Sequence, residues 1–422
     1  MRRFLRRLRP RSIRAWLAAG GVVVLVIAGV VIAAVVYKKN RTGSIYHPHA
    51  RFVPEPAPSK PVDRFSWPLY GYTHDHNRYF PTSSKLHAPF YQVWARGFGT
   101  LLEFPPVMRG DHIFQLGDDA VLNAIDKYTG RIFWSRKLGS LSASSPAVAG
   151  RVVYVTVLSG PNGGRIVALD YGHGKTIWSR DLPAASESSP MVFGGRVYFG
   201  TQSGEVYALN ASNGHVIWTY QAGGAVKASP TLKNGVLYFG DYSGQVQAVS
   251  ASDGRRIWRS GSEGAVFGSG TFYSTPAVAW GRVFLGNTDG RVYSYDAGTG
   301  RLDWAVQTGN YVYASPAVTS APGLGPTVYL GSYDGTFYAL SAPSGRIEWR
   351  FNAGGRISGS ATIIGKTVYF ADLGDRRTYG LGISTGRVAF TWPSGSFDPV
   401  ISDGERIYLT GYSGLFSLAP KK

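Results

Sequence analysis

The chain has 422 residues, enough for one large domain or two of ordinary size. It contains no cysteine, which excludes disulfides, thiolate nucleophiles, cysteine-based zinc sites and a lipid-modified N-terminal cysteine. The net charge is +19, but residues 1–41 hold ten basic side chains and no acidic one, so about half of the charge belongs to the N-terminus. No basic run interleaved with aromatic residues follows, and we expect no nucleic-acid partner.

The first feature in chain order is an uncharged apolar stretch of 22 residues from Trp16 to Tyr37. A helix needs about 20 apolar residues to cross a bilayer, and aromatic residues commonly stand at its two ends. Seven arginines precede the stretch, and three basic residues follow it closely. The positive-inside rule then predicts a cytoplasmic tail over residues 1–15 and one transmembrane helix over residues 16–37. Everything after this helix is expected outside the plasma membrane of a bacterium.

A cleaved signal peptide is the rival interpretation of the same stretch. The apolar part is longer than a signal-peptide core of about 7–15 residues. The sequence from Val35 to Lys38 also lacks the small residues typical of a cleavage site. We therefore expect an uncleaved anchor.

Residues 38–62 carry five prolines and separate the apolar stretch from the rest of the chain. Such a composition favours extended, semi-rigid chain with little to bury. We expect a linker that holds a folded domain away from the membrane.

A sequence motif, here called the repeated phrase, recurs about every forty residues. It contains a glycine and, four positions later, an aromatic residue. The pairs are Gly130 and Trp134, Gly174 and Trp178, Gly214 and Trp218, Gly254 and Trp258, Gly300 and Trp304, Gly345 and Trp349, and Gly386 and Phe390. Each unit also contains four short segments of alternating hydrophobicity between glycine-rich turns. This pattern predicts an all-β fold, a β-propeller of four-stranded antiparallel blades.

The number of blades follows from the residues that open each unit. A proline opens seven of eight units, and Ala361 replaces it in the other. The last unit lacks a fourth strand, whereas the strand pattern around Trp94 has no unit before it. Pairing these two would close the ring and remove exposed sheet edges. We predict an eight-bladed propeller over residues 63–422, with residues 63–90 as an N-terminal strap.

The repeated aromatic residues, together with Trp94, are expected to end the outer strands and to wedge between blades. Burying one such side chain removes about 150–250 Å² from water, which corresponds to about 4–6 kcal/mol before entropy costs. We therefore assign these aromatic residues and the phrase glycines to structural docking rather than to ligand binding.

The phrase A-x-D-x-x-T-G-x-x-x-W, as in residues 124–134, resembles the tryptophan-docking motif of the pyrroloquinoline-quinone (PQQ) repeat superfamily. The resemblance covers residues 63–418, and the segment from Trp67 to Pro81 resembles the phrase found before the first blade in many quinoproteins. Two branches are implied. One contains quinoprotein alcohol dehydrogenases that hold PQQ and calcium; the other contains the non-catalytic envelope propellers of the BamB type.

Several departures favour the BamB-type branch. The adjacent cysteines usual in the dehydrogenases are absent, the repeats are close to minimal in length, and no catalytic aspartate or calcium-ligand set matches the family positions. The resemblance therefore implies a non-catalytic scaffold that binds envelope components, with no catalytic residue, metal or cofactor. The alternative is a PQQ-dependent oxidoreductase with its site in the central channel, which would bring PQQ and calcium.

A candidate partner-binding face emerges from the positions of seven aromatic residues. Three occupy the same turn of different units, and four lie in connections between units: Tyr242, Tyr333 and Tyr412, then Phe272, Tyr273, Tyr311 and Tyr313. Tyrosine offers a large rigid contact area with a polar tip, which suits a protein or envelope-polymer partner. The alternative is that these side chains only cover blade edges.

Two groups of polar residues could suggest a metal site. His74 and His76 are spaced to chelate but lack a third ligand nearby in the sequence. Aspartates also recur in equivalent turns, but on different blades, so turn capping is the expected role: Asp118, Asp119, Asp241, Asp289 and Asp334.

Overall fold

The structure is a computed structural model that describes residues 27–31, 43–47, 50–61, 66–82, 85–160, 163–263, 270–397 and 400–421. The chain forms two compact units, Met1–Gly43 with Glu263–Gly268 and Ser44–Ser262 with Ser269–Lys422; the second contains every described strand. Residues 27–31 are helical, and among the described residues no helix has the length and apolar character needed to span a bilayer. The cytoplasmic tail and the rest of the transmembrane helix expected from the sequence lie outside the described residues.

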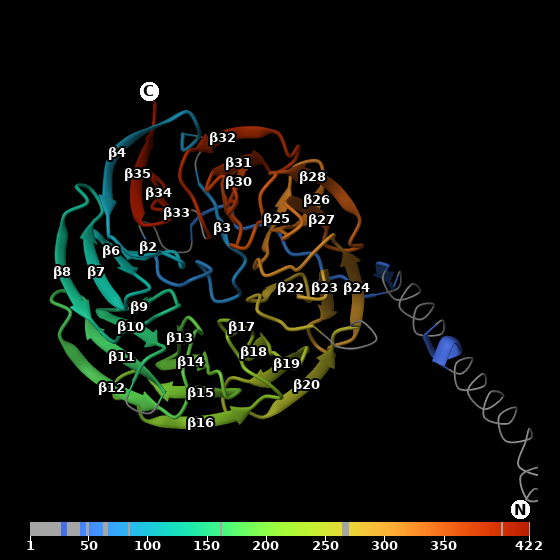
Figure 1. Cartoon of the computed structure of the whole chain (residues 1–422), viewed down its shortest axis with the longest axis horizontal. Coiled ribbons are helices and arrows are strands. Elements are labelled where there is room, and N and C mark those ends of the chain that lie inside the picture. The colour runs from blue at the N-terminus through green and yellow to red at the C-terminus, as the bar shows by residue number, and fades with distance from the viewer. Residues whose placement is uncertain are drawn as a thin grey trace, which may run out of the picture. The chain divides into compact units, whose positions relative to one another are not determined.

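The second unit is an eight-bladed β-propeller (Figure 1). Its eight sheets, called blades 1 to 8 here, each have four antiparallel strands, and β1 (Ile45–Tyr46), β2 (Ser66–Trp67) and β3 (Tyr79–Phe80) each add a short fifth strand to one of them. Blade 1 contains β5 (Val107–Arg109), β6 (His112–Leu116), β7 (Val121–Asp126) and β8 (Ile132–Lys137). Blade 2 contains β9 (Ala147–Ala149), β10 (Val152–Val157), β11 (Gly164–Asp170) and β12 (Thr176–Leu182). Blade 3 contains β13 (Met191–Phe193), β14 (Arg196–Gly200), β15 (Glu205–Asn210) and β16 (Val216–Gln221). Blade 4 contains β17 (Thr231–Lys233), β18 (Val236–Gly240), β19 (Gln245–Ser250) and β20 (Arg256–Gly261).

The remaining blades complete the ring. Blade 5 contains β21 (Ala277–Ala279), β22 (Arg282–Gly286), β23 (Arg291–Asp296) and β24 (Leu302–Gln307). Blade 6 contains β25 (Ala317–Ala321), β26 (Gly325–Gly331), β27 (Thr336–Ser341) and β28 (Ile347–Asn352). Blade 7 contains β29 (Thr362–Ile364), β30 (Thr367–Ala371), β31 (Thr378–Gly382) and β32 (Val388–Trp392). Blade 8 contains β33 (Val400–Ser402), β34 (Ile407–Thr410), β35 (Gly414–Pro420) and β4 (Phe90–Gly97).

Blade 3 illustrates why each repeat folds in this way. The second and third strands, β14 and β15, are buried except at their ends, because neighbouring blades cover both of their faces. The outer strand β16 is mostly exposed, but Trp218 is buried and lies opposite Ala208. Gly214 closes the turn between β15 and β16 at a φ of +71°, a conformation that other residues resist.

The ring is closed by the strand near the N-terminus, as the sequence predicts. β4 pairs antiparallel with β35, and Trp94 lies opposite Ser417. Figure 1 shows the blue β4 beside the red β35. One hydrophobic cluster contains Ile113 of blade 1, Tyr369 of blade 7 and Leu409 of blade 8. Blade 8 therefore joins the two ends of the propeller both by main-chain pairing and by a shared core.

Seven tryptophans dock each blade on the next. Each indole Nε1 donates a hydrogen bond of 2.9–3.2 Å to a backbone carbonyl in the turn between the third and fourth strands of the neighbouring blade, here called the docking turn: Trp94 to Lys127, Trp134 to Tyr171, Trp178 to Ala211, Trp218 to Ala251, Trp258 to Ala297, Trp304 to Ala342 and Trp349 to Ile383. Each indole also lies against the glycine of that turn, where an added Cβ would stand 2.5–2.9 Å from the ring: Gly130, Gly174, Gly214, Gly254, Gly300, Gly345 and Gly386. The glycine and the aromatic residue of the repeated phrase thus serve two successive interfaces.

Phe390 replaces tryptophan in blade 7 for a topological reason. In blade 8, the third strand lies near the C-terminus and the fourth near the N-terminus, so they are not joined by a docking turn. An indole N–H would have no turn carbonyl to meet in this blade. Phe390 instead packs edge-to-face on Phe90 of β4, with ring centroids 5.4 Å apart.

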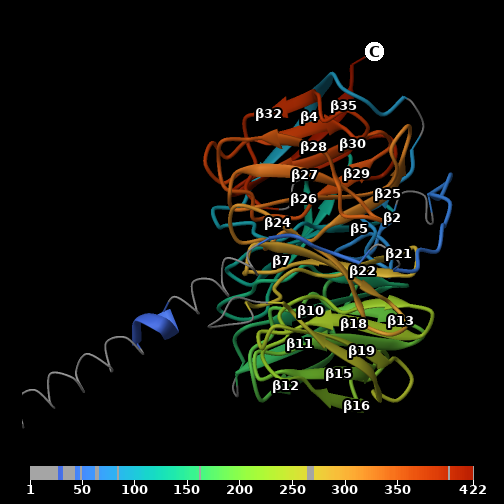
Figure 2. The ribbon, with the colours of Figure 1, turned by 90° about the vertical axis from the view of Figure 1, so that its right-hand side faces the viewer.

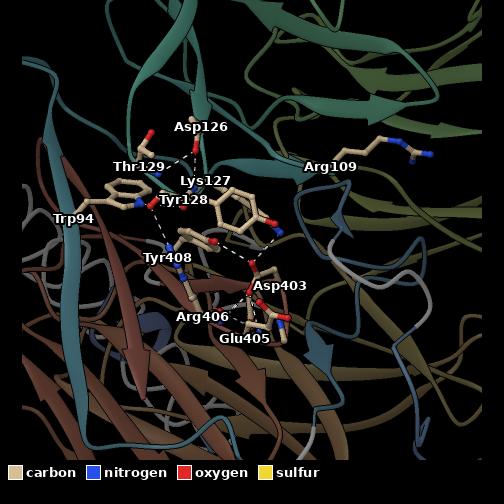
Figure 3. A network of polar contacts seen from close by, with 12 residues as sticks. Trp94, Arg109, Asp126, Lys127, Tyr128, Thr129, Asp403, Glu405, Arg406 and Tyr408 are labelled. Atoms are coloured by element: carbon tan, nitrogen blue, oxygen red, sulfur yellow. Dashed lines mark hydrogen bonds and ion pairs between the residues drawn. The ribbon is translucent and has the colours of Figure 1, made fainter. Parts of the chain in front are cut away.

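A buried ion pair fixes blade 8 to blade 1 (Figure 3). Lys127 Nζ lies 3.1 Å from Asp403 Oδ2, and both side chains are 1% exposed. The Tyr408 hydroxyl donates to the same oxygen at 3.0 Å, and the backbone N–H groups of Glu405 and Arg406 donate to the other. Burial, together with the Asp403 charge, raises the pKa of Tyr408, which keeps this phenol a neutral donor. The other docking turns carry alanine, isoleucine or tyrosine at the Lys127 position, so this closure contact is particular to blade 1.

Within the strap predicted over residues 63–90, residues 66–80 cross the inner strands of the ring, and the name strap is used below for these residues (Figure 1). β2 (Ser66–Trp67) pairs with β5, and β3 (Tyr79–Phe80) pairs with β29. Between them the strap accepts backbone hydrogen bonds from blades 2, 4, 5, 6 and 7, donated by Val148, Leu232, Val278, Val318 and Ile363. The Tyr70 hydroxyl of the strap lies 2.8 Å from Ser360 Oγ. The strap therefore covers one end of the axial channel.

The described part of the proline-rich segment, which the sequence predicts to be an extended linker, contacts blade 5. β1 (Ile45–Tyr46) pairs antiparallel with β24 as a fifth strand of blade 5. The buried Arg282 donates from Nε to the Arg51 carbonyl at 2.8 Å, and Trp280 donates from Nε1 to the Glu55 carbonyl at 3.0 Å. Prolines limit strand pairing but leave carbonyl groups available as acceptors. The segment is thus extended, yet it lies on the propeller; Figure 2 gives the edge-on view.

Substituting Gly254 should separate the cost of backbone conformation from the cost of docking. Gly254 and Gly235 have φ values of +74° and +77° in the same blade, but an added Cβ meets Trp218 only at Gly254. Gly235→Ala should cost about 1 kcal/mol of unfolding free energy, and Gly254→Ala about 1–3 kcal/mol more, because the indole must move. Denaturant unfolding of both variants measures the difference. Equal costs would contradict the docking role.

Lys127→Met should destabilise the propeller by about 3–5 kcal/mol, because it leaves the buried Asp403 carboxylate without its cation. The exposed Lys175→Met is the matched control and should change the unfolding free energy by less than about 0.5 kcal/mol. Adding Asp403→Asn to Lys127→Met should recover part of the loss, since it removes the unpaired charge. A Lys127→Met variant as stable as the control would rule out a structural role for the ion pair.

Candidate functional site

Five of the seven aromatic residues singled out from the sequence lie together at one face of the propeller. Tyr242 and Tyr333 come from the turns between the second and third strands of blades 4 and 6, and Tyr273, Tyr311 and Tyr313 come from the connections that flank blade 5. Neighbouring ring centroids are 4.9–6.4 Å apart along Tyr242, Tyr273, Tyr313, Tyr333 and Tyr311. These five residues form one continuous group, here called the tyrosine cluster.

The other two aromatic residues do not join this group. Phe272 is fully buried and packs against Tyr293, with ring centroids 5.6 Å apart, so it belongs to the core between blades 4 and 5. Its neighbour Tyr273 points the opposite way because successive residues of extended chain alternate sides. Tyr412 stands on blade 8 and stacks under Arg376, 4.0 Å from its ring centroid. Among the described ring pairs it contacts no member of the tyrosine cluster.

The mouth of the axial channel adjoins the tyrosine cluster and is lined by one position of the repeat. Glu103, Glu187, Lys227, Tyr273 and Tyr313 all line the channel cavity, and each stands three residues before the proline that opens its blade. Sequence reasoning missed the charged members of this ring. The proline register could have found them, because equivalent positions of a propeller face the axis together.

The channel is narrow and closed below this ring. Its cavity has a volume of about 40 Å³, room for a water molecule or two. A serine or threonine stands just before the opening proline of blades 2 to 6, and these hydroxyl groups join adjacent blades, as in Thr275 N–H to Ser315 Oγ at 3.0 Å and Ser229 N–H to Thr275 Oγ1 at 3.1 Å. Tyr70 of the strap also lines the cavity. The channel is thus a shallow polar recess beside the tyrosine cluster.

Cations border the tyrosine cluster on two sides. Lys227 Nζ stands 5.0 Å from the ring centroid of Tyr242 and 2.8 Å from a carboxylate oxygen of Glu187. The guanidinium of Arg356 stands 5.9 Å from the ring centroid of Tyr333. Such placements are favourable because the face of an aromatic ring is electron-rich.

The phenols of the cluster are donors rather than bases. Burial, followed by the nearby charge of Glu187, raises the pKa of Tyr242. Burial, followed by the charges of Glu103 and Glu187, raises the pKa of Tyr273 well above its usual range. Tyr311 is nevertheless 49% exposed. The cluster therefore offers neutral hydroxyl groups and apolar ring area to a partner at neutral pH.

The chain matches the family model described as outer membrane protein assembly factor BamB over residues 91–221, 162–310 and 314–417. It belongs to the BamB-type family of PQQ-repeat β-propellers. No curated protein sequence matches it. The family assignment agrees with the resemblance carried by the repeated docking phrase.

Solved structures share this fold at low sequence identity. BamB from Moraxella catarrhalis is 19% identical, with a TM-score of 0.64 over 78% of this chain and 100% of that chain. The quinohemoprotein alcohol dehydrogenase ADHIIG from Pseudomonas putida HK5 is 15% identical, with a TM-score of 0.72 over 85% of this chain and 80% of that chain. The quinohemoprotein alcohol dehydrogenase from Comamonas testosteroni is 14% identical, with a TM-score of 0.71 over 87% and 82%.

The channel of this BamB-type propeller does not fit the quinone and calcium that some PQQ-repeat proteins hold. A cofactor of that size needs a pocket of roughly 300 Å³ or more, far above the cavity present. No group of three or more His, Cys, Asp or Glu side chains in the described ranges is placed to hold a metal ion. His74 Nε2 donates to the Val192 carbonyl at 3.1 Å, and His76 Nδ1 lies 2.9 Å from Thr231 Oγ1, so both rings serve strap contacts.

Most of the recurring turn aspartates cap their own turns. Asp241 Oδ1 accepts from the backbone N–H groups of Ser243 and Gln245 at 2.9 and 3.2 Å. Asp118 differs, because burial raises its pKa to about 6. The backbone hydrogen bond from Glu103 lowers this pKa in part, and the negative charge of the adjacent Asp119 raises it. The folded protein therefore disfavours the ionised form of Asp118.

Asp118→Asn should stabilise the propeller at alkaline pH and not at acidic pH. The pKa of Asp118 in the folded protein, about 6, lies above its value in the unfolded chain. The wild-type protein therefore loses part of its unfolding free energy as the pH rises from 4 through 6. Because Asp118 is only half-buried, we expect a gain of about 1 kcal/mol at pH 8 after solvent screening and almost none at pH 4. Thermal melts of both proteins across this range test the sign. A constant difference at all pH values would contradict it.

Proposed function

We propose that this BamB-type propeller is a membrane-anchored, extracytoplasmic scaffold that binds a protein or polymer of the bacterial envelope without chemistry of its own. The observation that carries the proposal is the continuous tyrosine cluster beside the channel mouth. Tyrosine is enriched in binding interfaces because a large ring with few rotatable bonds loses little entropy on contact. The uncharged apolar stretch over residues 16–37 supplies the proposed anchor.

The chemistry of the tyrosine face favours a partner with both apolar and acidic groups. Ring faces of Tyr311 and Tyr333 offer apolar contact, while Lys227 and Arg356 stand at the edges of the cluster. Acidic groups of a partner can pair with these cations as its apolar groups cover the rings. A peptide loop or an anionic cell-wall polymer would meet both requirements.

Non-catalytic binding also agrees with the protonation and pairing of the channel groups. The raised pKa values of Tyr242 and Tyr273 remove them as bases at neutral pH, and Glu187 is paired with Lys227. General acid–base catalysis requires groups whose pKa values lie near the working pH. A PQQ-dependent oxidoreductase is the alternative function, and it rests on fold similarity alone.

A photo-crosslinking amino acid at position 311 of the full chain should capture an envelope partner in cells. Tyr128 is the matched control, because it is also a tyrosine, is equally exposed at 49%, and lies in a docking turn on the other face. The partner captured from position 311 should be absent from position 128. Identical crosslinks from both positions, or none from position 311, would count against the tyrosine face as the binding surface.

The purified full chain, mixed with PQQ and calcium, should give no dye-linked alcohol oxidation and no shift of its melting temperature. The expectation follows from the volume of the channel cavity, about 40 Å³. Turnover together with a cofactor-dependent melting shift would replace the scaffold proposal with the oxidoreductase alternative. A quinoprotein dehydrogenase assayed in parallel is the positive control.

A further inference from the structure

A pocket of the propeller lies on the strap face, away from the tyrosine cluster. Its volume is about 670 Å³. The walls come from residues 55–58 of the proline-rich segment, from the strap, from the hairpins of blades 3 to 5 and from β25 of blade 6, with apolar side chains that include Tyr72, Phe193, Trp280 and Val318. Pockets of roughly 300–1,000 Å³ with apolar walls and a few polar groups are typical of small-molecule sites.

The proline-rich wall is held in place by an unusual residue. Trp280 has a φ of +54° in a hairpin turn where the equivalent residue of blades 1 to 4 and 7 is glycine or asparagine. A bulky residue persists in that conformation only where its surroundings hold it there. Here Trp280 stacks on Phe52, donates from Nε1 to the Glu55 carbonyl and accepts from the Val53 N–H. The wall is therefore a docked part of the propeller rather than a passing contact.

Both carboxylates that line the pocket share one cation, Lys233. Lys233 Nζ lies 2.7 Å from Glu55 Oε2 and 3.7 Å from Asp75 Oδ2. Burial lowers the pKa of His74, which is therefore neutral at pH 7. Each of these charges already lies in an ion pair, so a charged ligand would lose its hydration and would have to compete with an existing partner.

One polar group of the pocket has no partner in the described structure. Thr319 is 3% exposed, and its hydroxyl oxygen has no hydrogen-bond partner. Thr319 lines the pocket together with Val318, and its hydroxyl oxygen, which is closed to solvent, would face a ligand after rotation about the Cα–Cβ bond. A buried hydroxyl without a partner carries a free-energy cost, which a bound hydrogen-bonding group would remove.

We propose that this pocket binds a neutral small molecule with an apolar body and a single hydrogen-bonding group, and that the Thr319 hydroxyl recognises that group. Because residues 55–58 form one wall, the molecule binds only when the proline-rich segment is docked. Ligand binding and segment docking then stabilise each other by the same factor. The site is separate from the proposed partner-binding face.

The test is a titration of the purified full chain with N-phenyl-1-naphthylamine, a neutral aromatic amine whose fluorescence rises in apolar surroundings. Wild-type protein should bind it at one saturable site. Ala57→Trp places an indole in the wall of the pocket and should weaken binding by at least about tenfold. Ser59→Trp, at an exposed position of the same segment outside the pocket, is the matched control and should bind normally. Thr319→Val should weaken binding about two- to tenfold.

A second measurement reads the coupling without any variant. Arg282 binds the Arg51 carbonyl, the group that trypsin attacks when it cleaves after Arg51. Saturating probe should therefore slow cleavage at Arg51 by the same factor by which docking strengthens binding.

No saturable binding, or equal affinity in Ala57→Trp, would overturn the proposed site. Association of chains that Ala57→Trp abolishes would instead assign the pocket to a second copy of the protein, and unchanged affinity in Thr319→Val would overturn the role of its hydroxyl.

Discussion

The main-chain pairing of β4 with β35 is the contact on which the rest of the structure depends. Without it blade 8 would have three strands and an unpaired edge. Phe390 would lose Phe90, and the docking turn of blade 1 would lose the indole of Trp94. The strap precedes β4 in the chain, so its position across the ring also depends on the placement of this strand. Both faces of the propeller therefore rest on a single antiparallel ladder.

The fold could be predicted from the sequence because its determinants are local and repeated. Every docking turn requires a positive φ, which glycine supplies, and the aromatic residue four positions later docks on the following blade. One repeated motif therefore indicates both the turn and the contact between blades. Contacts that occur once were not predictable in this way. Lys127 and Asp403 are 276 residues apart, and nothing in either local sequence announces the other. Likewise, the docking of the proline-rich segment depends on Trp280 and Arg282, and neither residue indicates in the sequence which segment it contacts.

The candidate site was predicted in part for a similar reason. The shared turn position predicts that Tyr242 and Tyr333 lie on one face. It does not predict that Phe272 points into the core while Tyr273 points toward the channel. Tyr412 shares the turn position yet stands on a distant blade. The charged channel residues follow a register set by the blade-opening proline, which is a long-range regularity of the ring rather than a motif of any one repeat.

The two faces of the propeller offer different chemistry. One carries neutral phenols bordered by Lys227 and Arg356, in a shallow relief suited to a large partner. The other carries a half-open, mainly apolar pocket partly built from the segment that leads toward the N-terminus. An occupant of that pocket would alter the attachment of the segment, not the tyrosine face.

The eighth blade also constrains the order in which the chain can mature. β4 ends at Gly97, and its partner begins only at Gly414, so this strand emerges from the ribosome long before β35 exists. During that interval blades 1 to 7 can assemble in sequence, while β4 keeps an open row of main-chain donors and acceptors. Such an edge pairs readily with other chains. Polypeptides that end before residue 414 would therefore keep a nearly complete ring in which β4 stays unpaired. Synthesis of the C-terminal strand is thus needed before this edge is protected from aggregation.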